Sequence, residues 1–94
     1  MLMTDVLIAW TQDEVAKVPL QRFTGRVGDV EVGTVEYDGA HRLWTWWSPL
    51  AEEAWGHARD EGGAKRGFEV WLRWWLENFR AFFEGQRGSQ GYGS

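Results

Sequence analysis

The sequence predicts an α+β domain in which a three- to four-stranded antiparallel sheet packs against one long C-terminal helix. Apolar and polar residues alternate between positions 30 and 47, which is the period of a strand. An Asp38-Gly39 pair, typical of a two-residue hairpin turn, interrupts this run. From Ala64 onward, apolar residues recur every three or four positions, which is the period of a helix.

Length and composition limit the classes of protein that fit this chain. Its 94 residues correspond to one domain, and eight Trp and five Phe enrich the small core. The absence of cysteine excludes disulfides and cysteine-based metal sites and fits a reducing compartment. The N-terminus lacks the basic start and long apolar stretch of a signal peptide, and no segment is long enough to cross a membrane. We therefore expect a cytoplasmic protein.

The N-terminal part allows a short helix. Thr11 and Glu14 have the spacing of a helix capping box, and a helix over residues 12–18 would end at Pro19. The strands are expected to follow from Leu20 onward, because the pattern changes there to a period of two.

The tryptophan-rich segment 42–47 is expected to be a central strand, since both of its faces carry large side chains. The preceding strand should contain a bulge near Gly33 and Thr34. Residues 50–58 fit either a helical turn or a short edge strand, and we favour the strand. Buried core is the favoured role for the tryptophans of segment 42–47, with base or carbohydrate stacking as the alternative.

The C-terminal helix should begin after a capping Asp60 and end at Gly85. Residues 1–84 would then form a single α+β domain and residues 85–94 a flexible tail rich in glycine and serine. A helical wheel places charges of alternating sign on one solvated stripe: Arg66, Glu69, Arg73, Glu77, Arg80 and Glu84. The i,i+4 spacing predicts the ion pairs Glu69–Arg73, Arg73–Glu77 and Arg80–Glu84. The opposite face is expected to pack on the sheet through Ala64, Phe68, Trp71, Leu72, Trp75, Phe79 and Phe82.

The apolar arc of this helix is wider than a small sheet needs. It spans about 200°, whereas a helix that faces a core needs little more than about 100°. Val70 and Trp74 lie on one side of the surplus, and Leu76 and Phe83 lie on the other. Two interpretations stay open: other parts of the chain cover these flanks, or a second protein does.

An exposed tryptophan beside a valine on a rigid helix is a typical interface anchor. The sequence therefore predicts a homodimer through the C-terminal helix, centred on the Trp74 flank, with a foreign partner at the same flank as the competing view. The residues expected to bind a protein partner are Val70, Arg73, Trp74, Leu76, Glu77 and Phe83.

No catalytic or cofactor motif stands out. The two histidines are isolated in the sequence, and a metal site at His57, Asp60 and Glu61 would lack a fixed ligand spacing. Glu52 and Glu53 are adjacent, so their carboxylates diverge on a strand or a helix. We expect no enzyme activity, no cofactor and no metal.

The formal net charge of −4 weighs against binding to a phosphate backbone as the main activity. The alternative function is nevertheless a nucleic-acid-binding domain, in which an exposed tryptophan stacks on bases and basic side chains contact phosphates. Those basic residues would be Arg22, Arg26, Arg42, Lys65 and Arg66.

The order of parts between residues 26 and 76 resembles that of a diffuse group of small phage and mobile-element proteins. In that group a tryptophan-bearing strand leads to a glycine–alanine segment and an Ala-Lys…Glu-x-Trp-Leu helix, matched here by WSPL, WGHA and GAKRGFEVWLRWW. The strands-then-helix order is also similar to the later part of a double-stranded-RNA-binding domain, whose basic motif at the start of the helix is partly matched by Lys65-Arg66.

The resemblance to phage proteins implies a fold and a genetic setting. Together with the small size, the acidity and the surplus apolar surface, it leads us to expect a non-enzymatic protein-binding module. The expected partner is a host defence complex, which such a module would inhibit in the manner of an anti-CRISPR protein.

Overall fold

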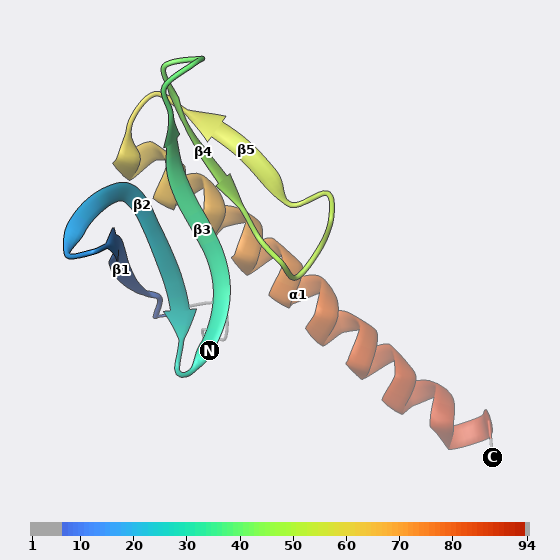
Figure 1. Ribbon diagram of the computed structural model, residues 1–94. Coiled ribbons are helices and arrows are strands. Elements are labelled where there is room, and N and C mark those ends of the chain that lie inside the picture. The colour runs from blue at the N-terminus through green and yellow to red at the C-terminus, as the bar shows by residue number, and fades with distance from the viewer. Residues whose placement is uncertain (1–6, 94) are drawn as a thin grey trace.

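The computed structural model describes residues 7–93, with side chains described for residues 7–82 and for Glu84. Five strands are followed by one helix (Figure 1): β1 (Ala9–Val15), β2 (Val18–Val27), β3 (Val30–Asp38), β4 (Leu43–Trp47), β5 (Trp55–Ala58) and α1 (Glu61–Gly93). The strands form one antiparallel meander in the order β1-β2-β3-β4-β5. The predicted α+β class and the long C-terminal helix are confirmed, and the sheet has one strand more than the upper estimate.

The predicted short N-terminal helix is wrong, because residues 12–18 belong to a β-hairpin. β1 pairs with β2, and a two-residue turn at Ala16 and Lys17 connects them. Both turn residues have positive φ angles, of 53° and 68°, which give the turn a twist that matches two antiparallel strands. The spacing of Thr11 and Glu14 suits a capping box only when the intervening backbone is helical, and here cross-strand pairing holds it extended.

The hairpin between β3 and β4 is present, but its loop has four residues (39–42) instead of the predicted two. The Asp38 carboxylate accepts backbone hydrogen bonds from Ala40 at 3.0 Å and His41 at 3.3 Å, and lies 2.8 Å from Nδ1 of His41. The side-chain bond from His41 and the backbone bonds lower the pKa of Asp38. These bonds stabilise a wider loop than the Asp-Gly pair alone suggests.

The predicted bulge lies in β3, one residue before the expected position. The register shifts by one between the pairs Gly25–Gly33 and Arg26–Glu31, which leaves Val32 as the extra residue. The Ser48 hydroxyl donates to the Val32 carbonyl at 2.7 Å, so the bulge is tied to the segment that leaves β4.

Residues 55–58 form the strand β5. This confirms the strand that we favoured over a helical turn for this part of the chain.

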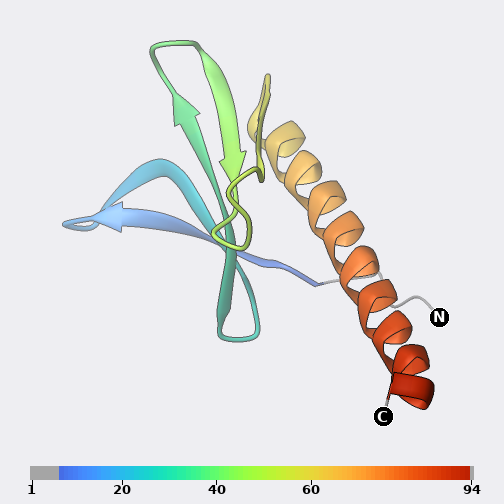
Figure 2. The ribbon, with the colours of Figure 1, turned by 90° about the vertical axis from the view of Figure 1, so that its right-hand side faces the viewer.

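The helix α1 crosses one face of the sheet and contacts β3, β4 and β5 (Figure 2). Phe68 is fully buried and packs with Val32 and Leu72. Its ring occupies the place of a side chain at Gly33, where an added Cβ would lie 2.4 Å from a ring carbon. This glycine therefore lets the helix approach the sheet closely.

A second close approach surrounds the indole of Trp46. An added Cβ at Gly56 of β5 or at Gly67 of α1 would lie 2.6 or 2.8 Å from Nε1 of Trp46. The indole thus fills the space between the edge strand and the helix, which supports the core role expected for this tryptophan.

The start of α1 is as predicted. The Asp60 carboxylate accepts a hydrogen bond from the Gly63 N–H at 2.6 Å, which is the geometry of an N-cap. The predicted end at Gly85 is wrong, because the helix continues to Gly93. Gly85 costs a helix about 1 kcal/mol relative to alanine, which weakens a helix without ending it. The division into a domain and a flexible tail stays a prediction.

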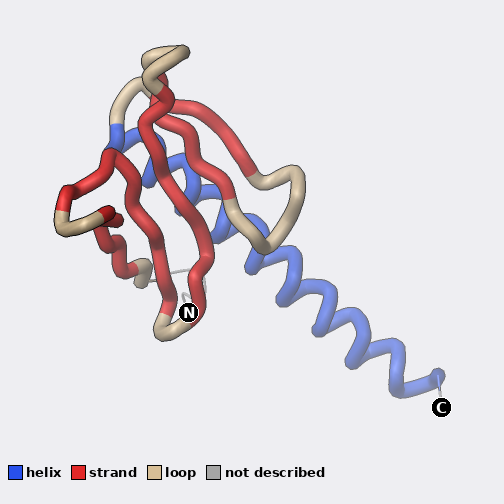
Figure 3. The backbone as a smooth tube through the Cα atoms, viewed as in Figure 1, coloured by secondary structure: helices blue, strands red, loops and turns tan. Residues whose placement is uncertain are grey.

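The helix is longer than the sheet, and its second half extends beyond it (Figure 3). The predicted burial of Phe79 and Phe82 on the sheet is therefore wrong, since they are 46% and 56% exposed. The expected core positions nearer the start of the helix behave as predicted: Ala64, Phe68 and Leu72 are buried, and Trp71 and Trp75 are half-buried.

We expect Gly33→Ala to destabilise the protein by about 1–3 kcal/mol, because the new methyl group would overlap the Phe68 ring in a packed core. Gly39→Ala is the matched control, since its nearest neighbour would lie at an ordinary 3.7 Å. Urea denaturation of both variants measures the difference. Equal stabilities would show that the close contact at Gly33 is not a constraint on the fold.

Candidate protein-interaction site

The side of α1 that faces away from the sheet carries two large apolar residues. Val70 is 62% exposed and Trp74 is 59% exposed. With Arg73 and Glu77 they occupy positions i, i+3, i+4 and i+7, which lie on one side of a helix. We call these four residues the solvent flank. Of the two possibilities that the sequence left open, the structure shows Val70 and Trp74 uncovered by the rest of the described chain, and the binding role of the flank stays a prediction.

The solvent flank cannot turn inward, because the other side of the helix is anchored. Phe68 and Leu72 have exposed fractions of 0% and 2% and hold that side against β3. Trp74 lies about 120° around the helix from Phe68, and Val70 about 160°. Neither residue reaches the sheet, so their exposure follows from the way the helix is seated.

Leu76, on the other flank of the helix, lies between two hollows. The first is an apolar groove of about 250 Å³ between α1 and the β2–β3 hairpin. It is lined by Val27, Val30, Val32, Leu50, Leu72, Trp75 and Leu76. The second hollow, of similar volume, is lined by Leu76, Glu77, Phe79 and Arg80. The side chain of Phe83, also predicted to bind a partner, lies outside the described side chains.

Charged pairs run along the exposed end of the helix. Arg80 donates to Glu77 at 3.0 Å and lies 3.7 Å from Glu84. The predicted Arg80–Glu84 pair is confirmed. Among the described side chains, the predicted pairs of Arg73 with Glu69 and with Glu77 do not form, and Glu77 is paired with Arg80 instead.

The basic residues of the nucleic-acid alternative do not form one surface. Arg22 and Phe23 are neighbours in β2, so their side chains point to opposite faces of the sheet. Lys65 lies over the Phe23 ring at 4.1 Å and bonds Glu61 at 2.8 Å, which places it on the helix side. Arg22 is on the other side. Of the remaining three, Arg26 is also in β2, Arg42 is in the β3–β4 loop and Arg66 is an exposed residue of α1.

Arg22 takes part in a polar network on the face of the sheet away from the helix. It donates to Asp13 at 2.7 Å, and the Thr24 hydroxyl donates to the same carboxylate at 2.9 Å. Partial burial acts to raise the pKa of Asp13, but the hydrogen bonds from Arg22 and Thr24 outweigh it and lower the pKa. This network is not apparent from the sequence, because the capping-box spacing of Thr11 and Glu14 favours a helix over residues 12–18, whereas the strand β1 brings Asp13 beside Arg22 and Thr24.

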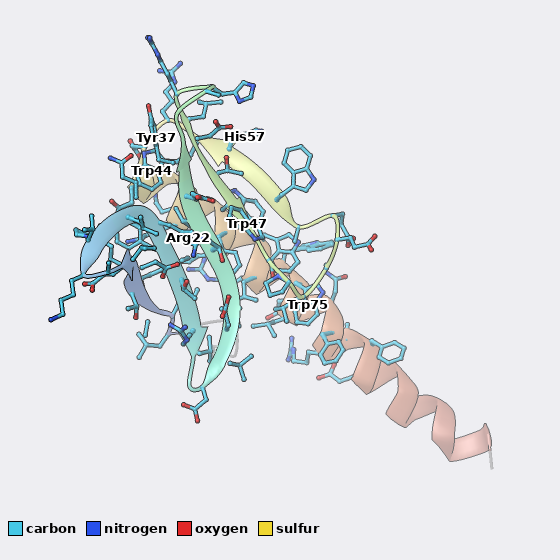
Figure 4. All side chains as sticks on the ribbon, in the orientation of Figure 1. Arg22, Tyr37, Trp44, Trp47, His57 and Trp75 are labelled. Carbon is cyan, nitrogen blue, oxygen red and sulfur yellow. The ribbon has the colours of Figure 1, made fainter. Side chains whose placement is uncertain are left out.

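The tryptophans of β4 divide between the two faces. Trp46 packs against Phe68 and Trp71 on the helix side, and Trp44 contacts Tyr37 and Phe23. Trp47 belongs to the other face, opposite Trp55 of β5, which is 58% exposed. In Figure 4, Arg22, Trp47 and His57 lie over the sheet in front of the helix, and Trp75 lies where the helix leaves the sheet.

The three residues of the conceivable metal site, His57, Asp60 and Glu61, each make other contacts. The His57 ring packs edge-on against Trp55 at 5.4 Å, Asp60 caps the helix, and Glu61 bonds Lys65. Within the described residues no group of three or more His, Cys, Asp or Glu side chains is placed to hold a metal ion. The described helix is also not apolar enough over a sufficient length to span a bilayer.

Comparisons of the chain with protein-family models, with curated proteins and with solved structures gave no match.

We expect Asp13→Asn to lower the stability of the protein at neutral pH and to weaken the dependence of that stability on pH. Because the folded-state pKa of Asp13 lies below its ordinary value of 3.8, the ionised carboxylate stabilises the fold above about pH 4. That contribution is lost as the pH falls through the folded pKa, so the two proteins should converge in acid.

Thermal unfolding between pH 7 and pH 2 measures this difference. The control is Glu14→Gln on the same strand, whose carboxylate makes no hydrogen bond among the described residues. A gap between Asp13→Asn and the wild type that stays constant with pH would contradict the assignment.

Proposed function

We propose that this chain is a non-enzymatic protein-binding module that docks through the solvent flank of α1. The observation that carries the proposal is the exposure of Trp74, at 59%, on a helix whose opposite side is buried. Tryptophan is the residue type most enriched among those that dominate interface energies. A rigid helix that presents apolar anchors one turn apart is a common way of filling a groove on a partner.

The charges beside Trp74 suit such a role. Arg73 is exposed and unpaired among the described side chains, and Glu77 forms an ion pair with Arg80. Charges at the rim of an interface contribute more to orientation and association rate than to affinity. A partner that fits this flank would offer an apolar groove with an acidic group near Arg73.

The setting we propose is that of a phage or mobile-element inhibitor of a host defence complex, similar to anti-CRISPR proteins. It is supported by the resemblance of residues 26–76, by the small size and by the net charge of −4. The nucleic-acid alternative is not retained as a second candidate, because Arg22 and Lys65, two of its five basic residues, lie on opposite faces of the sheet.

A plasmid-interference assay tests both parts of the proposal. Cells that carry a CRISPR nuclease complex and a targeted plasmid would express the wild type, Trp74→Glu or Trp55→Glu. The matched control is Trp55, which is 58% exposed but lies on β5. We expect the wild type and Trp55→Glu to protect the plasmid. Trp74→Glu should lose protection, because removing a hot-spot aromatic costs about 2 kcal/mol or more, roughly thirtyfold in affinity.

Two results would count against the proposal. Protection that survives Trp74→Glu would move the docking surface away from the solvent flank. The absence of protection across a panel of purified defence nucleases, tested with folded wild-type protein, would reject the inhibitor setting.

A further inference from the structure

The apolar groove between α1 and the β2–β3 hairpin is too small for a structured partner. All seven residues that line it are apolar, and its volume is about 250 Å³. A cavity of about 150 Å³ in a protein core holds one benzene-sized group. The groove therefore has room for one or two apolar side chains, whereas a helix, at least about 10 Å across with its side chains, is too wide to enter it.

The described part of the chain begins beside this groove. Ala9 of β1 pairs with Arg26 of β2, so the antiparallel register places Ile8 beside Val27. Ile8 packs against the buried cluster that contains Phe68, and Val27 lines the groove. The residues that precede Ile8 therefore start from the wall of the groove.

The start of the described chain leaves the groove unfilled. Leu7 is 89% exposed and is not among the residues that line the groove. Val30, at the turn end of the hairpin, lines the groove and is 58% exposed. An apolar groove that stays open to water favours an apolar occupant, because burial of apolar surface is the main favourable term in folding.

The sequence that precedes Leu7 supplies such an occupant. Residues 1–6, MLMTDV, begin with three apolar side chains and contain both methionines of the chain. At about 3.3 Å per extended residue, residues 4–6 reach about 10 Å from Leu7. The part of α1 that lines the groove, from Leu72 to Leu76, is only about 6 Å long. The tether is thus long enough to bring residues 1–3 to any part of the groove.

We propose that the apolar groove is the docking site of the chain's own N-terminal segment, with residues 1–3 in the groove. Methionine suits this site, because its flexible thioether fills irregular apolar gaps and makes favourable contacts with aromatic rings such as that of Trp75. The tether makes the contact intramolecular, at an effective concentration of about a millimolar, so a small contact area is sufficient. The docked segment ties the start of β1 to the helix and closes the open side of the core.

The docked segment leaves the solvent flank open. Leu76, which lines the groove, and Trp74 are two positions apart, which separates them by about 160° around the helix. The N-terminal segment and a protein partner at the solvent flank therefore use different sides of α1.

Methyl NMR of the full chain tests the proposal, because methionine methyl labels report on this segment alone. We expect at least one methionine methyl signal to be shifted upfield by the Trp75 ring and to give cross-peaks to the groove-lining valines. Met3→Leu assigns the two signals. Signals at the positions of an unfolded chain, or cross-peaks only to residues outside the groove, would overturn the proposal.

A matched pair of exposed valines locates the contact. Val30→Glu places a charge at the groove and should abolish the cross-peaks. Val18→Glu is the control, since Val18 is 59% exposed and lies at the β1–β2 turn, away from the groove-lining residues. Loss of the cross-peaks in both variants, or in neither, would contradict docking in the groove.

The segment itself is tested by a second pair of variants. Leu2→Asp should return the methionine signals to their unfolded positions, because a charge in an apolar groove is costly. Asp5→Asn should keep the cross-peaks, since residue 5 belongs to the tether. The proposal fails when Leu2→Asp retains the wild-type spectrum.

An N-terminal segment from a second copy would give the same shifts, and isotope-filtered spectra distinguish the two cases. Methionine-labelled chains are mixed with chains labelled only at valine and leucine. We expect no cross-peaks between the two kinds of chain, and cross-peaks between them would overturn the intramolecular contact. Trp74→Glu should leave the methionine signals unchanged, so this proposal and that of the solvent flank can fail separately.

Discussion

The seating of Phe68 over Gly33 is the contact on which the rest of the structure depends. The Phe68 ring is fully buried and lies where any side chain at position 33 would have to be. Gly56 and Gly67 make the same kind of space for Trp46 one strand further along. Two close approaches on neighbouring strands determine both the rotation of α1 about its own axis and its direction across the sheet. This rotation determines which residues of the covered part of α1 face away from the sheet.

A helix seated in this way on a sheet shorter than itself has two separate uncovered surfaces. The solvent flank with Val70 and Trp74 faces away from the sheet along the covered part of the helix. The core-facing stripe of α1 continues past the sheet, and Phe79 and Phe82 on that part of the stripe are exposed.

Charged residues that suggest a phosphate-binding surface have local roles in the fold. Arg22 and Thr24 hold Asp13 and so tie the β1–β2 hairpin to the face of the sheet away from the helix. Lys65 lies over Phe23 and pairs with Glu61 on the opposite face. Cation–π contacts and short ion pairs of this kind stabilise the two faces separately. They also place Arg22 and Lys65 on opposite faces of the sheet, so these two residues do not belong to one basic surface.

The sequence by itself determined the features that depend on local periodicity. The α+β class, the Asp60 cap and the position of Val70 and Trp74 away from the core-facing stripe follow from side-chain spacing, because the angle of a residue around a helix is a local property. Only the tertiary structure decided the strand at residues 12–15, where pairing with β2 overrides a capping-box spacing. It also decided the exposure of Phe79 and Phe82. A helical wheel gives the direction in which a side chain points, whereas burial depends on whether a distant strand extends far enough to cover it.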